Sequence, residues 1–116
     1  RKYWLADRGG VCSTEFWVLA ANHQIVIPEF LFYLVATEEF ISMASMAYGT
    51  HMPRSDWNLA RDYRLELPGL DEQRAIASVL SDMDAEIEAL ERRRDKTRLL
   101  KQGMMQELLT GRVRLV

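Results

Sequence analysis

The longest hydrophobic pattern in the chain runs from Asp71 to about Leu109, where apolar residues recur in alternating steps of four and three and no proline intervenes. Its apolar positions, called the seam here, are Ile76, Leu80, Met83, Ile87 and Leu90, and, after a polar interval, Thr97, Leu100, Met104 and Leu108. This spacing predicts a helix that pairs with another helix in a coiled coil. At ~1.5 Å per residue it would extend on the order of 58 Å. Gly103 predicts either a close approach of a neighbouring helix or a frayed end.

Shorter patterns fill the first part of the chain. Ser13–Ala20 is rich in aromatic and β-branched residues, and Asp62–Pro68 alternates apolar with charged side chains, so both segments are predicted to be strands. Pro28 favours the start of a short helix, and Thr37 is suited to cap a second one. The order strand, helix, helix, loop, strand predicts an α+β fold, in which a small mixed module precedes one long helix.

The boundary between the two parts is expected at Pro68 and Gly69, which end the second strand, and Asp71 is the expected N-cap of the long helix. The predicted divisions are 1–70 for the module, 71–110 for the helix and 111–116 for a tail. The chain begins with Arg1 instead of Met, so we expect a piece of a longer protein or a processed product.

Composition narrows the class of protein. The 116 residues are 48% hydrophobic and 28% charged, which argues against disorder. Cys12 is the single cysteine, so no disulfide forms within the chain, and a reducing cytoplasm is expected. A buried, inert Cys12 is favoured over a nucleophile because no base accompanies it. No apolar run approaches the ~20 residues that cross a bilayer, so no membrane is expected.

The charges of the long helix are sorted by sign although the net charge of the chain is only -2. Every charge from Asp82 to Glu91 is negative, and those from Arg92 to Lys101 are positive except Asp95. A favourable Glu88–Arg92 pair contributes only ~0.3–0.5 kcal/mol, which is too small to require such sorting. An antiparallel second helix that crosses near Glu91 and Arg92 explains it better, because each acidic half then faces a basic half. A solvated charged face and a phosphate-binding stripe are the alternatives.

Several motifs resemble a known family. They are the "LELP" that leads to Pro68, the "LxEQ" at Leu70–Gln73, the "IxxVLSxxDxxI" at Ile76–Ile87 and the "KQGMMQELLTG" at Lys101–Gly111. Together they resemble the C-terminal conserved region of the DNA-specificity subunit of type I restriction–modification enzymes. The preceding residues look like the back half of one of that family's target-recognition domains. Gly69 departs from the family pattern, in which proline is commoner.

The resemblance implies a non-catalytic DNA-recognition and scaffolding protein. Such subunits carry two target-recognition domains, each reading half of a split double-stranded DNA site, and two long helices that pair antiparallel and set the spacing. The helical region docks modification subunits, which carry the methyltransferase, and restriction subunits join them. The partner helix here is expected to come from a second copy or a related chain. The alternative is a plain coiled-coil dimerisation module without a DNA role.

The loop from Tyr48 to Trp57 is the candidate for DNA contact, because it interrupts the helical pattern with glycine, proline and polar groups. Its candidate residues are Tyr48, Thr50, His51, Arg54 and Ser55. Arginine is the commonest reader of guanine edges. An ordinary turn with Arg54 paired to Asp56 or Glu66 is the open alternative.

No catalytic residue, metal site or cofactor is expected. His23 and His51 are isolated, and no phosphate loop or nucleophile motif is present. The hypothesis that the chain is an enzyme is supported only by His51 and by scattered acidic residues.

Overall fold

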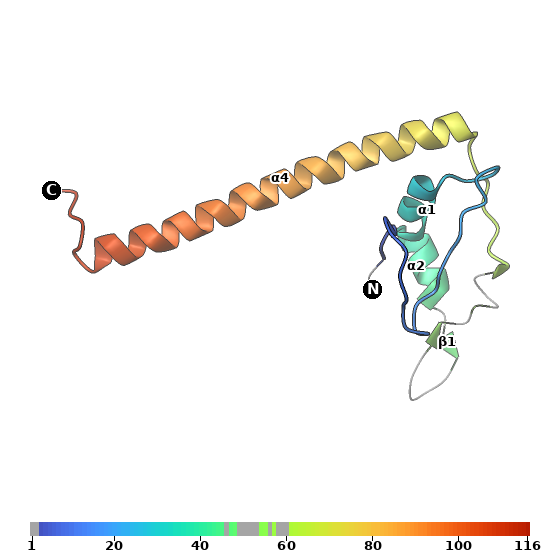
Figure 1. Cartoon of the computed structure of the whole chain (residues 1–116), viewed down its shortest axis with the longest axis horizontal. Coiled ribbons are helices and arrows are strands. Elements are labelled where there is room, and N and C mark those ends of the chain that lie inside the picture. The colour runs from blue at the N-terminus through green and yellow to red at the C-terminus, as the bar shows by residue number, and fades with distance from the viewer. Residues whose placement is uncertain (1–2, 46, 49–53, 56, 58–60) are drawn as a thin grey trace. The chain divides into compact units, whose positions relative to one another are not determined.

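The computed structural model describes residues 3–45, 47–48, 54–55, 57 and 61–116. Its elements are α1 (Pro28–Val35), α2 (Glu38–Ser45), β1 (Ala47–Tyr48), β2 (Arg54–Ser55) and α4 (Leu70–Leu109) (Figure 1). The chain divides into two compact units, Arg1–Val79 and Leu80–Val116. The first ten residues of α4 therefore belong to the first unit, and the rest of the helix forms most of the second.

The predicted α+β class is wrong, because helices account for nearly all regular structure in the described residues and the fold is all-α. The one exception is the antiparallel pairing of β1 with β2, two residues each. At Ser13–Ala20 the chain turns: the Phe16 amide bonds to the Ser13 carbonyl at 3.1 Å, and the Glu15 amide bonds to the Ser13 hydroxyl at 3.3 Å. Asp62–Pro68 is not assigned as a strand and pairs with no strand among the described residues. Both segments have strand composition, but a strand also needs a partner.

The two short helices form where the sequence predicts them. Pro28 occupies the first turn of α1, where its missing amide hydrogen costs nothing. Thr37 precedes α2, and its Oγ1 accepts a hydrogen bond from the Phe40 amide at 3.3 Å, which confirms the predicted cap. The same hydroxyl donates to the Leu34 carbonyl at 2.8 Å, so Thr37 links the end of α1 to the start of α2.

Thr37→Ala is expected to lower the free energy of unfolding of the first unit by about 1 kcal/mol, because the Phe40 amide loses its acceptor. Urea denaturation followed by tryptophan fluorescence measures this change. Thr37→Ser keeps the hydroxyl and is the matched control, with stability close to that of the unchanged chain. Equal stabilities for all three chains would show that the cap contributes nothing.

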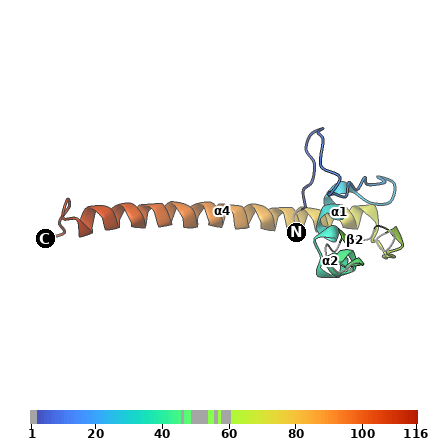
Figure 2. The same ribbon diagram turned by 90° about the horizontal axis from the view of Figure 1, so that it is seen from below.

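The long helix is confirmed: α4 spans 40 residues and runs unbroken in Figures 1 and 2. Its first residue is Leu70, so Asp71 is not the N-cap but lies in the first turn, where its carboxylate contacts Arg74 at 2.6 Å. Gly103 lies inside the helix and does not end it. At the C-terminal end Gly111 adopts a φ of 74°, and the Arg112 amide bonds back to the Glu107 carbonyl at 3.0 Å. This is the glycine-terminated cap common at helix ends.

The first unit has little buried apolar core among its described residues. Ala44 and Ala77 are the buried apolar side chains. Edge-to-face aromatic pairs supplement them: Tyr3 with Phe32, Phe32 with Tyr33, Trp17 with Trp57, and Phe40 with Tyr63. Burial, and then a hydrogen bond to Glu39, raise the pKa of the Tyr63 phenol. Cys12 is exposed, not buried as expected, because it lies in a segment without regular structure.

None of the described helices has both the length and the apolar character that crossing a bilayer requires.

Candidate partner-binding helix and DNA-contact loop

The apolar seam of α4 is open to solvent along most of its length in the single chain. Met83 is 55% exposed, Ile87 54% and Leu90 56%. Leu80 and Leu108 are half-buried, and every residue from Ser81 to Gln106 is exposed. A row of large apolar side chains repeating along one helix face is the pattern of a surface that another helix covers.

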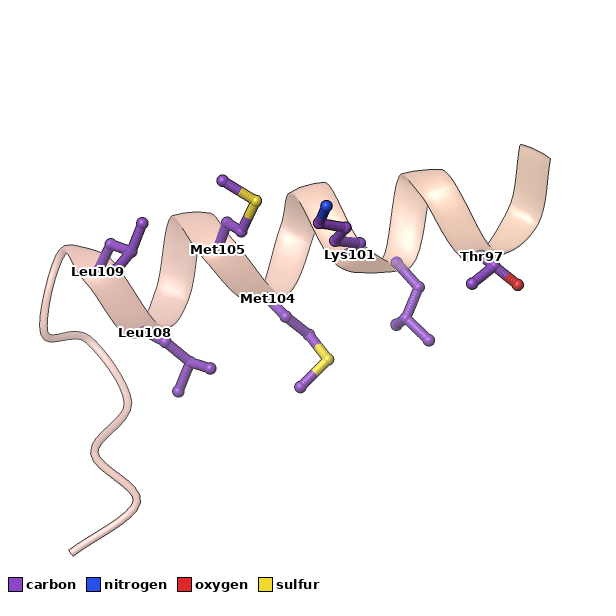
Figure 3. A pocket seen from close by; sticks show the side chains of 7 residues that line it. Thr97, Lys101, Met104, Met105, Leu108 and Leu109 are labelled. Carbon is purple, nitrogen blue, oxygen red and sulfur yellow. The ribbon is translucent and has the colours of Figure 1, made fainter. Parts of the chain in front are cut away.

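The C-terminal part of this face is a shallow apolar groove. It is lined by Thr97, Leu100, Lys101, Met104, Met105, Leu108 and Leu109. Figure 3 shows Thr97, Met104 and Leu108 pointing to one side of the helix and Lys101, Met105 and Leu109 to the other. The apolar face is therefore broader here than the seam alone. Methionine side chains adapt to irregular partner surfaces, which suits such a face to binding.

Ion pairs form within α4 at the junction between its acidic and its basic segment. Arg92 Nη1 lies 2.7 Å from Glu88 Oε1, which confirms the predicted pair. Arg94 contacts Asp95 at 2.9 Å and Glu91 at 3.5 Å. The hydrogen bond from Arg94 lowers the pKa of the Asp95 carboxyl, and that bond together with the Asp95 charge raises the pKa of Arg94. These ion pairs are exposed and therefore contribute little to the stability of the helix. They do not explain why the acidic residues of α4 precede its basic residues.

Gln73 is the one side chain that is completely buried among the described residues, at 0% exposure. Its Oε1 accepts a hydrogen bond from the Ile27 amide at 3.0 Å, and its Nε2 donates to the carbonyls of Ile25 at 2.9 Å and Pro68 at 2.8 Å. The amide thus satisfies backbone groups at the start of α1 and just before α4. Gln73 ties the base of α4 to the rest of the first unit.

The sequence reasoning missed Gln73 as a structural residue. The signal was present, because Gln73 lies three residues before Ile76 and therefore continues the apolar face of the helix by one step. A polar residue in an apolar series is either exposed or buried with its hydrogen bonds satisfied. The structure selects the second case.

The candidate DNA-contact loop begins and ends in the short β1–β2 pairing, which places Tyr48 opposite Arg54 and Ala47 opposite Ser55. Thr50 and His51 lie outside the described residues. The DNA-contact roles of all five candidate residues remain predictions.

The family model of the type I restriction modification DNA specificity domain matches residues 3–97, which is most of the chain. The chain belongs to this family. The family membership predicted from the motifs is thereby confirmed. The matched residues of this specificity domain include the first unit, Gln73 and α4 as far as Thr97, so the groove around Met104 and Leu108 lies beyond the match.

Two curated relatives of this specificity domain are specificity subunits by name. The chain is 31% identical over 101 residues to the type I restriction enzyme MjaVIII specificity subunit of Methanocaldococcus jannaschii, a match that covers 87% of the chain and 24% of that relative. It is 34% identical over 82 residues to the type I restriction enzyme HindI specificity subunit of Haemophilus influenzae, covering 67% of the chain and 18% of that relative. The chain thus spans about a quarter or less of the relatives it matches. No solved structure shows significant similarity to it.

Proposed function

We propose that the chain acts in the cytoplasm in sequence-specific DNA recognition and scaffolding for a type I restriction–modification complex. Residues 1–70 would form part of a target-recognition domain, 71–110 the coiled-coil helix and 111–116 a tail. The observation that carries the proposal is the family match over residues 3–97, and the names of both curated relatives agree with it. Double-stranded DNA and the modification and restriction subunits are the proposed partners.

The proposed role of α4 is that of a spacer, a dimerisation element and a docking site for modification subunits. Its exposed seam supports this role, since Met83, Ile87 and Leu90 leave more than half of each side chain in water. Burying a leucine-sized side chain contributes about 1.5–3 kcal/mol relative to leaving it exposed. A partner helix that covers the seam would bury several such side chains, and each would add to the free energy of association. The chemistry of methylation is proposed to reside in the modification subunits, with no catalytic group supplied by this chain.

The proposed DNA contact is the loop between Tyr48 and Trp57, with Arg54 as its principal base reader. A guanidinium that bonds to the O6 and N7 atoms of guanine discriminates against the wrong base by about 1–3 kcal/mol. Phosphate contacts from the other polar residues of the loop would position it without reading sequence.

A plain dimerisation module is the second candidate, and the charge of the chain favours it. Residues 1–70 carry six Lys or Arg against eight Asp or Glu, whereas DNA-binding modules usually have a basic excess. This candidate predicts that α4 pairs normally and that the chain adds nothing to the DNA affinity of the modification subunits.

Gel shifts with the chain, modification subunits and a pool of duplex DNA sequences separate the two candidates. DNA recognition predicts a complex that selects particular sequences and weakens as salt rises from about 50 to 200 mM, because phosphate contacts release counterions. Arg54→Ala is expected to weaken binding to the selected sequence about tenfold. Arg112→Ala is the matched control, since Arg112 pairs with Glu107 at the far end of α4. Complexes that form equally well without the chain would leave only the dimerisation role.

A further inference from the structure

Trp17 and Trp57 form an aromatic contact at the end of the candidate DNA-contact loop. Their ring centroids lie 5.4 Å apart and their planes meet at 78°, the edge-to-face arrangement that aromatic pairs favour. Trp57 comes just after β2, whereas Trp17 lies far upstream in the segment before α1. The contact therefore joins the end of the loop to a distant part of the same unit.

The chain around Trp17 is arranged so that this side chain, and not its neighbours, is covered. Just before Trp17, the Phe16 amide bonds to the Ser13 carbonyl at 3.1 Å, and the Glu15 amide bonds to the Ser13 hydroxyl at 3.3 Å. Such local bonds fix a turn in the backbone. Phe16 is 59% exposed and Val18 is 77% exposed, whereas Trp17 between them is half-buried. The segment thus presents Trp17 to its contact with Trp57.

The backbone of Arg54 depends on contacts from outside the loop. Arg54 lies in β2, where it is the pairing partner of Tyr48, but a pairing of two residues on each side is marginal by itself. β2 also packs against α2, and α2 contacts the chain beyond the loop through an edge-to-face pair of Phe40 with Tyr63 at 5.9 Å. Contacts that hold the two ends of the loop therefore determine how firmly the backbone of Arg54 is placed.

We propose that Trp17 is a positioning residue for DNA recognition, which holds the end of the loop through Trp57 and thereby fixes the orientation of Arg54. The inference rests on the proposed role of Arg54 in reading bases. A guanidinium that bonds to both O6 and N7 of one guanine needs a fixed approach to the base edge. Phosphate contacts carry no sequence information and tolerate a displaced loop. Loss of the Trp17 contact is therefore expected to reduce discrimination between sequences more than it reduces binding to DNA in general.

Hydrogen exchange without DNA tests the positioning step. Trp17→Leu keeps an apolar side chain but removes the ring, and exchange in the peptide that spans β1 and β2 is expected to become about fivefold faster. Trp17→Phe keeps an aromatic edge and is expected to stay within about twofold of the unchanged chain. Tyr3→Leu is the matched control, because it removes another edge-to-face contact of the same unit, with Phe32 at 5.9 Å, and should leave this exchange unchanged. Urea denaturation of each chain measures any general loss of stability.

Gel shifts with the modification subunits test the consequence for DNA. The measured quantity is the ratio of affinities for the selected duplex and for a duplex changed at the base pair that Arg54→Ala no longer discriminates. Trp17→Leu is expected to lower this ratio about tenfold, with little change in binding to the altered duplex. Trp17→Phe and Tyr3→Leu are expected to preserve the ratio.

Three results would overturn the positioning role. They are unchanged exchange in Trp17→Leu, an equal increase of exchange in Tyr3→Leu, and an affinity ratio that Trp17→Leu leaves intact. A chain without substitutions that selects no duplex at all would instead overturn the proposed function, and with it the role of Trp17 in reading DNA. The two failures are distinguishable, because the exchange measurement uses no DNA and the selection experiment uses no variant.

Discussion

A chain that carries Leu80→Glu together with Ile87→Glu is expected to sediment as a monomer at concentrations where the unchanged chain forms a dimer. Both carboxylates would lie on the apolar seam through which α4 is proposed to dimerise. Burying a carboxylate among apolar side chains without a basic partner is costly, and each copy in a dimer would carry both charges. The dissociation constant is expected to rise at least about 100-fold, which corresponds to about 2.8 kcal/mol. Sedimentation equilibrium over a concentration series measures it.

Leu99→Glu is the matched control for this double variant. Leu99 is 70% exposed and lies two residues beyond Thr97, which places it on the side of α4 away from the seam. Its replacement by glutamate is expected to leave the dissociation constant unchanged within about threefold. Circular dichroism of all variants should show the same helix content, because glutamate is a good helix former.

Local signals were sufficient to predict the helices. The periodicity of α4 extends over 40 residues, so the helical interpretation does not depend on tertiary contacts. Pro28 and Thr37 act within one turn of the helices they start, and their effects are visible in a few residues of sequence. The position of the last turn follows from Gly111, which takes a backbone conformation that other residues rarely adopt.

The predicted strands were wrong for a physical reason. Alternation of apolar and charged residues in Asp62–Pro68 favours an extended backbone, but a strand exists only where a neighbouring segment supplies hydrogen bonds. Whether that neighbour exists depends on the rest of the fold. The Ser13 hydroxyl accepts a hydrogen bond from the Glu15 amide. This local bond favours a turn over the extended backbone that a strand requires.

The positions of the seam along α4 were predictable residue by residue, whereas the hydrogen-bond partners of Gln73 were not. Seam positions follow from spacing along one helix. The partners of Gln73 are Ile25 and Ile27, 48 and 46 residues away in sequence, and the Pro68 carbonyl, five residues away. Only the folded chain brings the two distant groups to the amide.

Gln73→Met is expected to destabilise the first unit by about 3 kcal/mol. Methionine has nearly the same shape but can neither accept from the Ile27 amide nor donate to the carbonyls of Ile25 and Pro68. Leaving a buried backbone group without its partner costs about 1–3 kcal/mol, and three groups are affected here, some of which water can reach. For a domain that is stable by about 5–15 kcal/mol this is a large fraction.

Two optical probes distinguish the lower stability of the first unit from any change in α4. The three tryptophans, Trp4, Trp17 and Trp57, all lie in the first unit, so their fluorescence reports its unfolding in urea. Circular dichroism at low urea reports mainly α4, which contains most of the helical residues. Gln73→Met should shift the fluorescence transition to lower urea and speed hydrogen exchange of the Ile27 amide. Gln102→Met, at an exposed position of α4, should change neither. An unchanged exchange rate at Ile27 would mean that Gln73 does not hold the base of α4 to the start of α1.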